Sequence, residues 1–324
     1  MSLTPDESRL IGGSDIAAIL RLSPYRTPLQ VYARIVAGVR QADSAPLRRG
    51  RFLEEAVLRL YAAETGAELL TGPKLRHPRL PYTRASLDSL AVRDGRRVVE
   101  AKTAGLSEVR YWGEAGTDAV PVHYAPQTTW YAGVGLARGV VDTGDVDVAA
   151  LVAGDLRVYH LPWDAELFAM LESAVERFWM DHVEPRRPPP VTEPLKDLDA
   201  VGSLYPRNDG NARTWASLAT PERIAVEEWL RTREEERAAK ERRAAWEVRV
   251  KLALGTAPQL VGLPEDLGAT RIDWKANKDS VRTDWEGLAA ALATHVSPGE
   301  YKAVLEQHTT TTPGARPLVA RGST

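Results

Sequence analysis

The sequence predicts an α/β or α+β layer fold, in which helices flank one sheet. Two observations carry this prediction. Helical and strand-like segments alternate over the first 185 residues, and the helical ones show apolar residues at the spacing of one buried face. Two strand-like runs also meet at Asp94-Gly95, a dipeptide typical of hairpin turns. Layered helices and strands bury both kinds of apolar face around one core.

Three helices are expected before the first strand. Ser14 or Asp15 caps the first helix. Thr27 caps the second, Pro28 fills its first position and Gly38 ends it. The third helix carries an apolar stripe along one side. The helices are expected at residues 16–20, 28–38 and 50–64, and the stripe comprises Leu53, Ala56, Val57 and Leu60.

The strands follow these helices. Segments 85–92 and 97–103 are expected to form the hairpin. A helix is expected next, then two more strands and a closing helix. These four elements are expected at residues 126–136, 146–152, 156–161 and 164–182.

The chain divides into three zones by composition. Residues 1–185 hold the mixed helices and strands, and residues 186–213 are rich in Pro, Gly and Asp, which is typical of a linker or a surface-hugging connection. Residues 214–324 form a mainly helical extension. Within it we expect one long charged helix at 221–254, a strand at 270–275 and short helices at 283–294 and 298–306. The long helix fits a solvated surface better than a coiled-coil arm, because its apolar spacing is poor.

Composition excludes several classes of protein. Of the 324 residues, 44% are hydrophobic and 27% are charged, the balance of a globular protein. The chain has no apolar run of membrane-spanning length and no signal-peptide pattern at its start, so we expect no membrane and a cytoplasmic location. Cysteine is absent, which excludes disulfides and thiolate metal sites. A net charge of -2 argues against a general DNA-coating protein but allows a local basic groove.

Asp88, Glu100 and Lys102 are the candidate chemical residues. Glu100 and Lys102 are two apart on one strand and therefore share a face. Carboxylates bind a divalent cation through oxygen, and a neighbouring lysine can activate water or stabilise charge on a phosphate. Metal-assisted hydrolysis of a phosphodiester needs these groups. The same spacing also occurs in surface hairpins in which a Glu and a Lys form a salt bridge. Such hairpins are more common than metal sites.

The length of the hairpin loop decides whether these residues meet. A two-residue loop at Asp94-Gly95 pairs Asp88 with Ala101 and turns Asp88 away from Glu100. A three-residue loop pairs Asp88 with Lys102 and gathers all three side chains on one face. We therefore predict an odd-length loop or a bulge.

Glu54 is the candidate fourth member. On a helical wheel Glu54 lies beside the apolar stripe, whereas Glu55 points nearly opposite and is expected to be solvated. Among nearby residues, Trp112 and Trp130 are candidates for stacking on bases, and His123 is expected to be structural. Trp163 and Trp179 are expected in the core, because their settings are apolar.

Several blocks of sequence together resemble the YqaJ-type viral recombinases, relatives of the phage lambda exonuclease in the PD-(D/E)xK nuclease superfamily. The blocks occur in the family's order over residues 9 to about 182. They are Ile11-Gly-Gly-Ser-Asp-Ile-Ala-Ala-Ile19 with Leu22-Ser-Pro-Tyr-Arg-Thr-Pro28, Arg49-Gly-Arg-Phe-Leu-Glu54 with Tyr61 and Thr65-Gly66, Ser86-x-Asp88, Glu100-x-Lys102, and Tyr124 with Gln127. Segment 186–213, with Leu204-Tyr205-Pro206, and the charged helix after it resemble the longer phage members.

The resemblance implies a restriction-endonuclease-like core with a mixed central sheet flanked by helices, followed by the C-terminal extension. It implies that Mg²⁺ or Mn²⁺ is bound by Asp88, Glu100, the Ala101 carbonyl and Glu54. Lys102 would assist the attacking water, and Gln127 would orient the nucleophile or the phosphate.

A terminal 5′-phosphate would be bound by Ser14 and Ser86 with a nearby arginine. Ser14 has a second reason to bind an anion, because a helix N-terminus offers free N–H groups, although it equally fits a capping role. The candidate arginines are Arg51, Arg26 and Arg9. Arg9 is the weakest of them, because it lies only five residues before Ser14, closer than the family pattern suggests. Thr129 stands where the lambda enzyme has a second Gln, so this helix is expected to contact substrate differently.

The resemblance favours 5′→3′ digestion of double-stranded DNA ends, leaving 3′ single strands for recombination. It implies a trimeric ring around the duplex and a single-strand annealing protein as partner. One alternative is a structure- or site-specific DNA endonuclease of the same fold. Another is a DNA-end binding module without turnover, against which the intact Asp88, Glu100 and Lys102 argue.

Overall fold

A computed structural model describes residues 7–38, 44–92, 94–267 and 271–273, together with residues 285, 287, 289–290, 297 and 299–303. The chain divides into two compact units, residues 1–207 and 208–324. The first unit holds the candidate chemical residues and has the α/β architecture that the sequence predicts.

A five-stranded mixed sheet forms the centre of the first unit. Its strands lie in the order β1 (Glu68–Thr71), β4 (Ser89–Val92), β5 (Arg96–Ala104), β6 (Val146–Val152) and β7 (Asp155–Leu161). β5 and β6 run parallel and the other neighbours are antiparallel. The predicted strands at 97–103, 146–152 and 156–161 are confirmed. The sequence did not predict β1, because its side chains show no alternation of buried and exposed positions.

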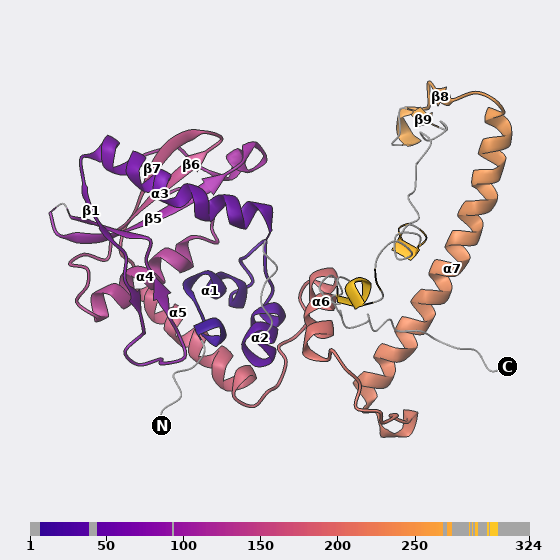
Figure 1. Ribbon diagram of the computed structural model, residues 1–324, viewed down its shortest axis with the longest axis horizontal. Helices are drawn as coiled ribbons and strands as arrows, with labels where there is room; N and C mark the ends of the chain where they lie inside the picture. The colour runs from indigo at the N-terminus through magenta and orange to yellow at the C-terminus, as the bar shows by residue number, and fades with distance from the viewer. Residues whose placement is uncertain are drawn as a thin grey trace. The chain divides into compact units, whose positions relative to one another are not determined.

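Helices cover both faces of this sheet (Figure 1). α3 (Ala45–Thr65) packs on one face, where Val57 and Tyr61 contact Val99 of β5 and Ala149 of β6. α4 (Ala125–Ala137) packs on the other face and is backed by α5 (Ala165–Phe178). Val98, two residues before Glu100, belongs to the core on this α4 side. Alternation along β5 therefore aims Glu100 and Lys102 toward α4.

The caps of the first two helices decide how they begin. α2 (Pro28–Ala37) begins as predicted, with Thr27 as N-cap and Gly38 in the left-handed conformation at its end. α1 (Gly13–Ile19) begins earlier than predicted, and its N-cap is Gly12 rather than Ser14 or Asp15. The carboxylate of Asp15 instead accepts the Gly12 N–H at 2.8 Å. Gly13 allows close packing here, because a Cβ on it would lie 2.5 Å from Cε1 of Tyr131.

The buried stripe of α3 differs from the predicted one. Val57 and Tyr61 are buried, Leu53 is half-buried, and Ala56 and Leu60 are exposed. The helix is therefore rotated relative to the prediction, toward the side that carries Glu54.

The first compact unit extends past residue 185, where the sequence placed its end. Residues 194–204 of the predicted linker form α6 (Pro194–Leu204), which packs on α2. The buried carboxylate of Asp197 accepts a hydrogen bond from Thr27 Oγ1 at 2.5 Å and from the backbone N–H of Thr192 at 2.9 Å. The composition of this segment is that of a linker, but a buried carboxylate and an apolar face attach it to the core.

The second unit contains the long helix α7 (Thr220–Leu254), which confirms the prediction at 221–254. Its charged side chains form short-range ion pairs along an exposed surface, such as Glu247–Lys251. A small hairpin follows, made of β8 (Gln259–Val261) and β9 (Arg271–Asp273), which lies within the predicted strand at 270–275. Residues 299–303 are helical, and most of the helix expected at 283–294 lies outside the described residues. None of the described helices is long and apolar enough to cross a membrane.

Candidate active site at the β4–β5 hairpin

The hairpin has the odd-length loop that the sequence predicts. Val92 pairs with Arg96, so three positions, 93–95, separate the paired residues. The predicted partner of Asp88 was wrong by two residues. If the β4–β5 register is extended, Asp88 lies opposite Glu100 and not opposite Lys102. Asp88 still lies on the same face as Glu100 and Lys102, because a shift of two residues does not change the face.

Asp88 lies where the chain leaves one strand and enters another. The predicted strand 85–92 is divided into β3 (Ala85–Ser86), which pairs with β2 (Lys74–Leu75), and β4, which pairs with β5. Because β4 pairs no further than Val99, the backbone of β5 beyond that residue has no β4 partner. The Asp88 carboxylate accepts the Ala101 N–H at 3.0 Å and fills this position. The break in the strand thus holds the side chain of Asp88 against β5.

Glu100 is the buried centre of the site. It is 1% exposed. Gln127 of α4 donates to its Oε1 at 2.6 Å, and the Lys102 ammonium also contacts Oε1. Burial raises the pKa of Glu100 to about 8, Lys102 opposes this change and the charge of Asp88 adds to it. Burial also raises the pKa of Asp88, against the lowering effect of Lys102 and the Ala101 N–H.

Lys102 and Gln127 both contact Oε1 of Glu100. The Lys102 ammonium lies 5.1 Å from the centre of the Tyr124 ring, in addition to its contact with Glu100. Gln127 is 8% exposed and its amide also lies 3.2 Å from the Tyr131 hydroxyl. Both donors contact the same carboxylate oxygen, and Glu100 also interacts with the side chain of Asp88.

Glu54 approaches from the helix on the opposite face of the sheet. It is half-buried on α3, and its pKa is raised first by burial and then by Asp88, while Lys102 lowers it. Glu55 is exposed and paired with Arg59, as a solvated charge is expected to be. α3 reaches the end of β5 here, because a Cβ on Gly50 would lie 3.9 Å from the hydroxyl of Thr103. Glu54 is therefore close enough to interact electrostatically with Asp88 and Lys102.

The donor set fits a divalent cation that keeps positions for other ligands. Oε2 of Glu100 is buried and has no hydrogen-bond partner within the described part of the chain. An orphaned buried carboxylate oxygen is costly unless a cation or a proton compensates it. Among the described residues, no group of three or more His, Cys, Asp or Glu side chains is arranged to hold a metal ion. Mg²⁺ does not require one, because it is usually bound by one or two carboxylates with water and phosphate oxygens.

Arg84, which directly precedes β3, is a basic residue near the start of α1 that the sequence reasoning missed. Ser14 is exposed in the first turn of α1, and Ser86 is half-buried on β3. Arg84 lies between these elements, because a Cβ on Gly12 would be 3.5 Å from its Nε, and its backbone N–H donates to the carbonyl of Ile11 at 2.8 Å. Arg84 is two residues before Ser86 and so shares its parity, a signal that was present in the sequence.

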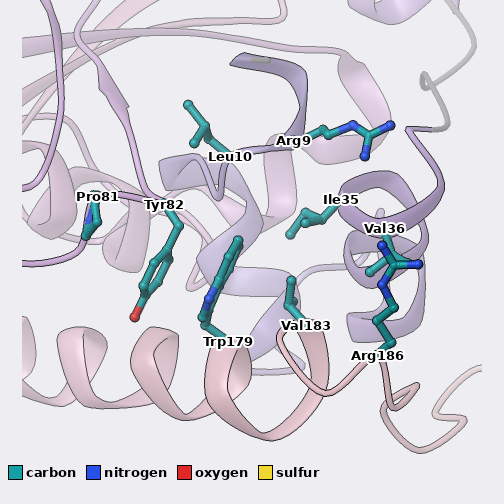
Figure 2. A pocket seen from close by; sticks show the side chains of 9 residues that line it. All are labelled: Arg9, Leu10, Ile35, Val36, Pro81, Tyr82, Trp179, Val183 and Arg186. Carbon is teal, nitrogen blue, oxygen red and sulfur yellow. The ribbon is translucent and has the colours of Figure 1, made fainter. Parts of the chain in front are cut away.

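The three arginines expected near a 5′-phosphate lie in different settings. Arg51 is exposed on α3. Arg26 is paired with Asp15 at 2.5 Å. Arg9 lines a cavity of about 440 Å³ together with Trp179 and Arg186, and neither Ser14 nor Ser86 lines it. Figure 2 shows both arginines on one side of this cavity, with Trp179 and Tyr82 stacked beside it. Their phosphate-binding role stays a prediction.

The aromatic residues near the site also separate into two groups. Trp130 is fully buried and cannot stack on a base, contrary to one of the expectations. Trp112 and His123 pack against Tyr124, with ring centres 5.5 Å and 4.1 Å away. Burial lowers the pKa of His123, and the Lys102 charge lowers it further, which favours the neutral ring. Together these rings line a cavity beside Lys102.

The half-buried Asp88 and the buried Glu100, with Lys102 beside them on a mixed sheet, define the candidate site. Residues 6–144 match the family model of the YqaJ-like viral recombinase domain, which confirms the resemblance noted in the sequence. This match includes all of the candidate site. The uncharacterized protein YqaJ of Bacillus subtilis (strain 168) is 25% identical over 220 residues, which are 66% of this chain and 66% of that relative's length.

Solved structures of two exonucleases are also similar to this chain. LHK-Exo in complex with dAMP is 16% identical and covers 55% of this chain and 90% of its own, with a TM-score of 0.44. LHK-Exo is an alkaline exonuclease from Laribacter hongkongensis. A phage-related exonuclease from Haemophilus somnus 129PT is 12% identical and covers 53% of this chain and 94% of its own, with a TM-score of 0.39.

Proposed function

We propose that this chain is a metal-dependent deoxyribonuclease that digests double-stranded DNA from 5′ ends and leaves 3′ single strands. The observation that carries the proposal is the half-buried Asp88 beside the buried Glu100, with Lys102 in contact with one Glu100 oxygen and the other oxygen without a hydrogen-bond partner among the described residues. The match of residues 6–144 to a viral recombinase domain supports DNA as the substrate. Recombination would then use the 3′ strand through an annealing protein, and a ring of three chains would surround the duplex.

The chain's own residues would divide the work of hydrolysis. Asp88, Glu100 and the Ala101 carbonyl would hold Mg²⁺ or Mn²⁺, with Glu54 as a further ligand directly or through water. The bound cation supplies Lewis-acid polarisation of the phosphate and a more acidic water. The Lys102 ammonium would stabilise charge that develops on the phosphate. Gln127 fixes the rotamer of Glu100 by its 2.6 Å hydrogen bond and thereby sets which oxygen faces the substrate.

A single digestion experiment tests the proposal. The substrate is a linear duplex with a 5′-phosphate on one strand and a fluorophore on each 3′ end, incubated with Mg²⁺ or with EDTA. We expect progressive loss of the 5′-phosphorylated strand with Mg²⁺ only, and a loss of rate of at least about 100-fold in Lys102→Ala. A closed circular duplex should stay intact.

The other outcomes assign the alternatives. Nicking or cutting of the closed circle would identify an endonuclease of the same fold. DNA binding without cleavage under any divalent metal would refute the enzyme and leave a DNA-end binding module.

Neighbouring residues on α3 provide a matched pair of variants. Glu54→Gln should slow cleavage and raise the Mg²⁺ concentration needed for half-maximal rate, because it removes a carboxylate near Asp88. Glu55→Gln changes the same kind of residue one position away, where it is exposed and paired with Arg59. It should cleave as the unchanged protein does. Equal effects from both variants would remove Glu54 from the site.

A further inference from the structure

Helix α7 carries an exposed apolar face that belongs to no site described above. On a helical wheel at about 100° per residue, four apolar side chains of this helix fall within an arc of about 80°. All four are exposed, and they are Val226, Leu230, Val248 and Leu252. β9 approaches another side of the helix, where its Ile272 lines one cavity with Val250 and Leu254 of α7. The four residues therefore form a face that is separate from the side near β9.

The residues of this face recur at intervals of eleven. Two rows have this spacing, of which the first is Val226, Arg237 and Val248 and the second is Leu230, Glu241 and Leu252. Eleven residues complete about three turns of an α-helix, so both rows stay on one side of α7 over a length of about 39 Å. This period explains why the heptad spacing of common coiled coils is poor here. Each row has apolar ends and one charged residue at its centre.

The two rows complement each other when a second copy of α7 runs in the opposite direction. A two-fold axis at residue 239 places Arg237 opposite Glu241 of the second copy. It also places each apolar residue of one row opposite an apolar residue of the other, Val226 against Leu252 and Val248 against Leu230. Each of these contacts occurs twice, as a two-fold interface requires. A parallel pair would instead place Arg237 beside Arg237 and Glu241 beside Glu241, so charge favours the antiparallel direction.

Charged residues along the two edges of the face show the same complementarity. Arg233 and Glu247 lie on one edge, and Glu227 and Arg249 lie on the other. The members of each pair are too far apart in sequence to meet within one helix, where ion pairs join residues three or four apart. In the antiparallel pair each lies beside the opposite charge of the second copy. The edges and the centre of the face therefore favour the same arrangement.

We propose that α7 pairs with α7 of a second copy of this chain, in an antiparallel two-helix interface centred on residue 239. Apolar contacts at both ends and ion pairs at the centre and along the edges stabilise it. The interface joins two copies of the first unit, each with its own candidate site. The inference goes beyond the proposed nuclease activity and does not depend on it, because none of the residues of this face belongs to that site.

Crosslinking tests the direction of the pair, since the chain contains no cysteine of its own. Leu230→Cys and Val248→Cys are prepared as separate full-length proteins and treated with a short thiol-specific crosslinker, alone and mixed. The mixture should give a crosslinked dimer and neither variant alone should, because the two positions on one helix lie about 27 Å apart and only the antiparallel pair brings them opposite each other. Crosslinks of each variant with itself would indicate a parallel pair and overturn the proposal, as would the absence of any crosslink.

Charge reversal tests the centre of the interface in the full-length protein by light scattering over a dilution series. Arg237→Glu and Glu241→Arg each place like charges opposite one another, so each should weaken self-association at least about 10-fold and halve the mass in solution, whether or not the first units also assemble. The double variant restores opposite charges and should recover the mass of the unchanged protein. Circular dichroism should show equal helix content in all of them.

The matched control is Arg242→Glu, which makes the same change of charge at an exposed position away from this face and should leave the mass unchanged. An equal loss of mass in this control would overturn the proposal. Single variants with the mass of the unchanged protein would assign the face to another occupant and overturn it as well. A double variant that stays dissociated would exclude the contact between Arg237 and Glu241 of the second copy and thereby the antiparallel register.

Discussion

Replacing Glu100 by glutamine should stabilise the metal-free protein while it abolishes cleavage. The folded-state pKa of about 8, against 4.5 in the unfolded chain, means that at pH 7 folding requires Glu100 to take up a proton, which opposes folding by about 3 kcal/mol. The glutamine amide has nearly the same shape, and its oxygen can still accept from Gln127 and Lys102. Because the variant also loses the charge attraction to Lys102, we expect a net gain in unfolding free energy of at least about 1 kcal/mol.

The pH dependence of this gain follows from the raised pKa. Below pH 4.5 Glu100 is protonated in both the folded and the unfolded chain and costs nothing. As the pH rises from 4.5 to about 8, the unfolded chain releases the Glu100 proton while the folded state retains it, so the unchanged protein loses stability that Glu100→Gln retains. The advantage of the variant should thus grow over this range and level off above it.

Thermal unfolding followed by circular dichroism in EDTA measures this difference. At pH 8 the midpoint of Glu100→Gln should exceed that of the unchanged protein by at least about 3 °C, and at pH 5 the two should nearly coincide. Mg²⁺ should raise the midpoint of the unchanged protein and not that of the variant. A lower midpoint for the variant, or a difference that does not change with pH, would refute the reasoning. Glu55→Gln is the control, since Glu55 is exposed.

Two further changes test features away from the site. Asp197→Ala removes the buried acceptor that joins α6 to Thr27, so it should lower the unfolding free energy by about 1–3 kcal/mol and speed hydrogen exchange in α6; unchanged exchange would contradict that attachment. His77 stacks on Trp130, and burial lowers its pKa while Glu172 raises it. The neutral ring is the form favoured by folding, so stability should fall as the pH drops below about 6.5. His77→Gln should show a smaller fall in thermal midpoint between pH 7.5 and 5.5, and an equal fall in both proteins would count against this role.

Much of the site could be predicted because side chains alternate regularly between the two faces of a strand. Residues two apart share a face, so Glu100 and Lys102 had to point together, and an odd loop had to bring Asp88 to the same side. The helical period also predicted that Glu54 lies at the edge of the buried face of α3, although the residues of the buried apolar stripe were predicted incorrectly. These inferences use only local geometry, which the chain fixes within a few residues.

The division of the predicted strand 85–92 could not be foreseen, because it depends on partners distant in sequence. β2 is only two residues long, and β1 shows no alternation of buried and exposed side chains, so the sequence predicted neither strand. Pairing with these strands is what divides segment 85–92 into β3 and β4. The positions of Arg9 and Arg84 depend in the same way on how α1 packs against β3 and α4. Spacing relative to Ser14 already made Arg9 the weakest of the three candidates, but only the packing of Gly12 shows that Arg84 lies close.

The three-residue turn between β4 and β5 also restricts how this hairpin can change length. A single inserted or deleted residue at positions 93–95 would shift the register by one and turn the side of β4 that leads into Asp88 away from Glu100. A change of two residues would keep the facing of both strands and alter only the length of the loop. Related chains that keep Asp88, Glu100 and Lys102 in working order should therefore differ here by even numbers of residues, or compensate an odd change with a bulge. Insertions and deletions in this loop are thus expected to comprise even numbers of residues.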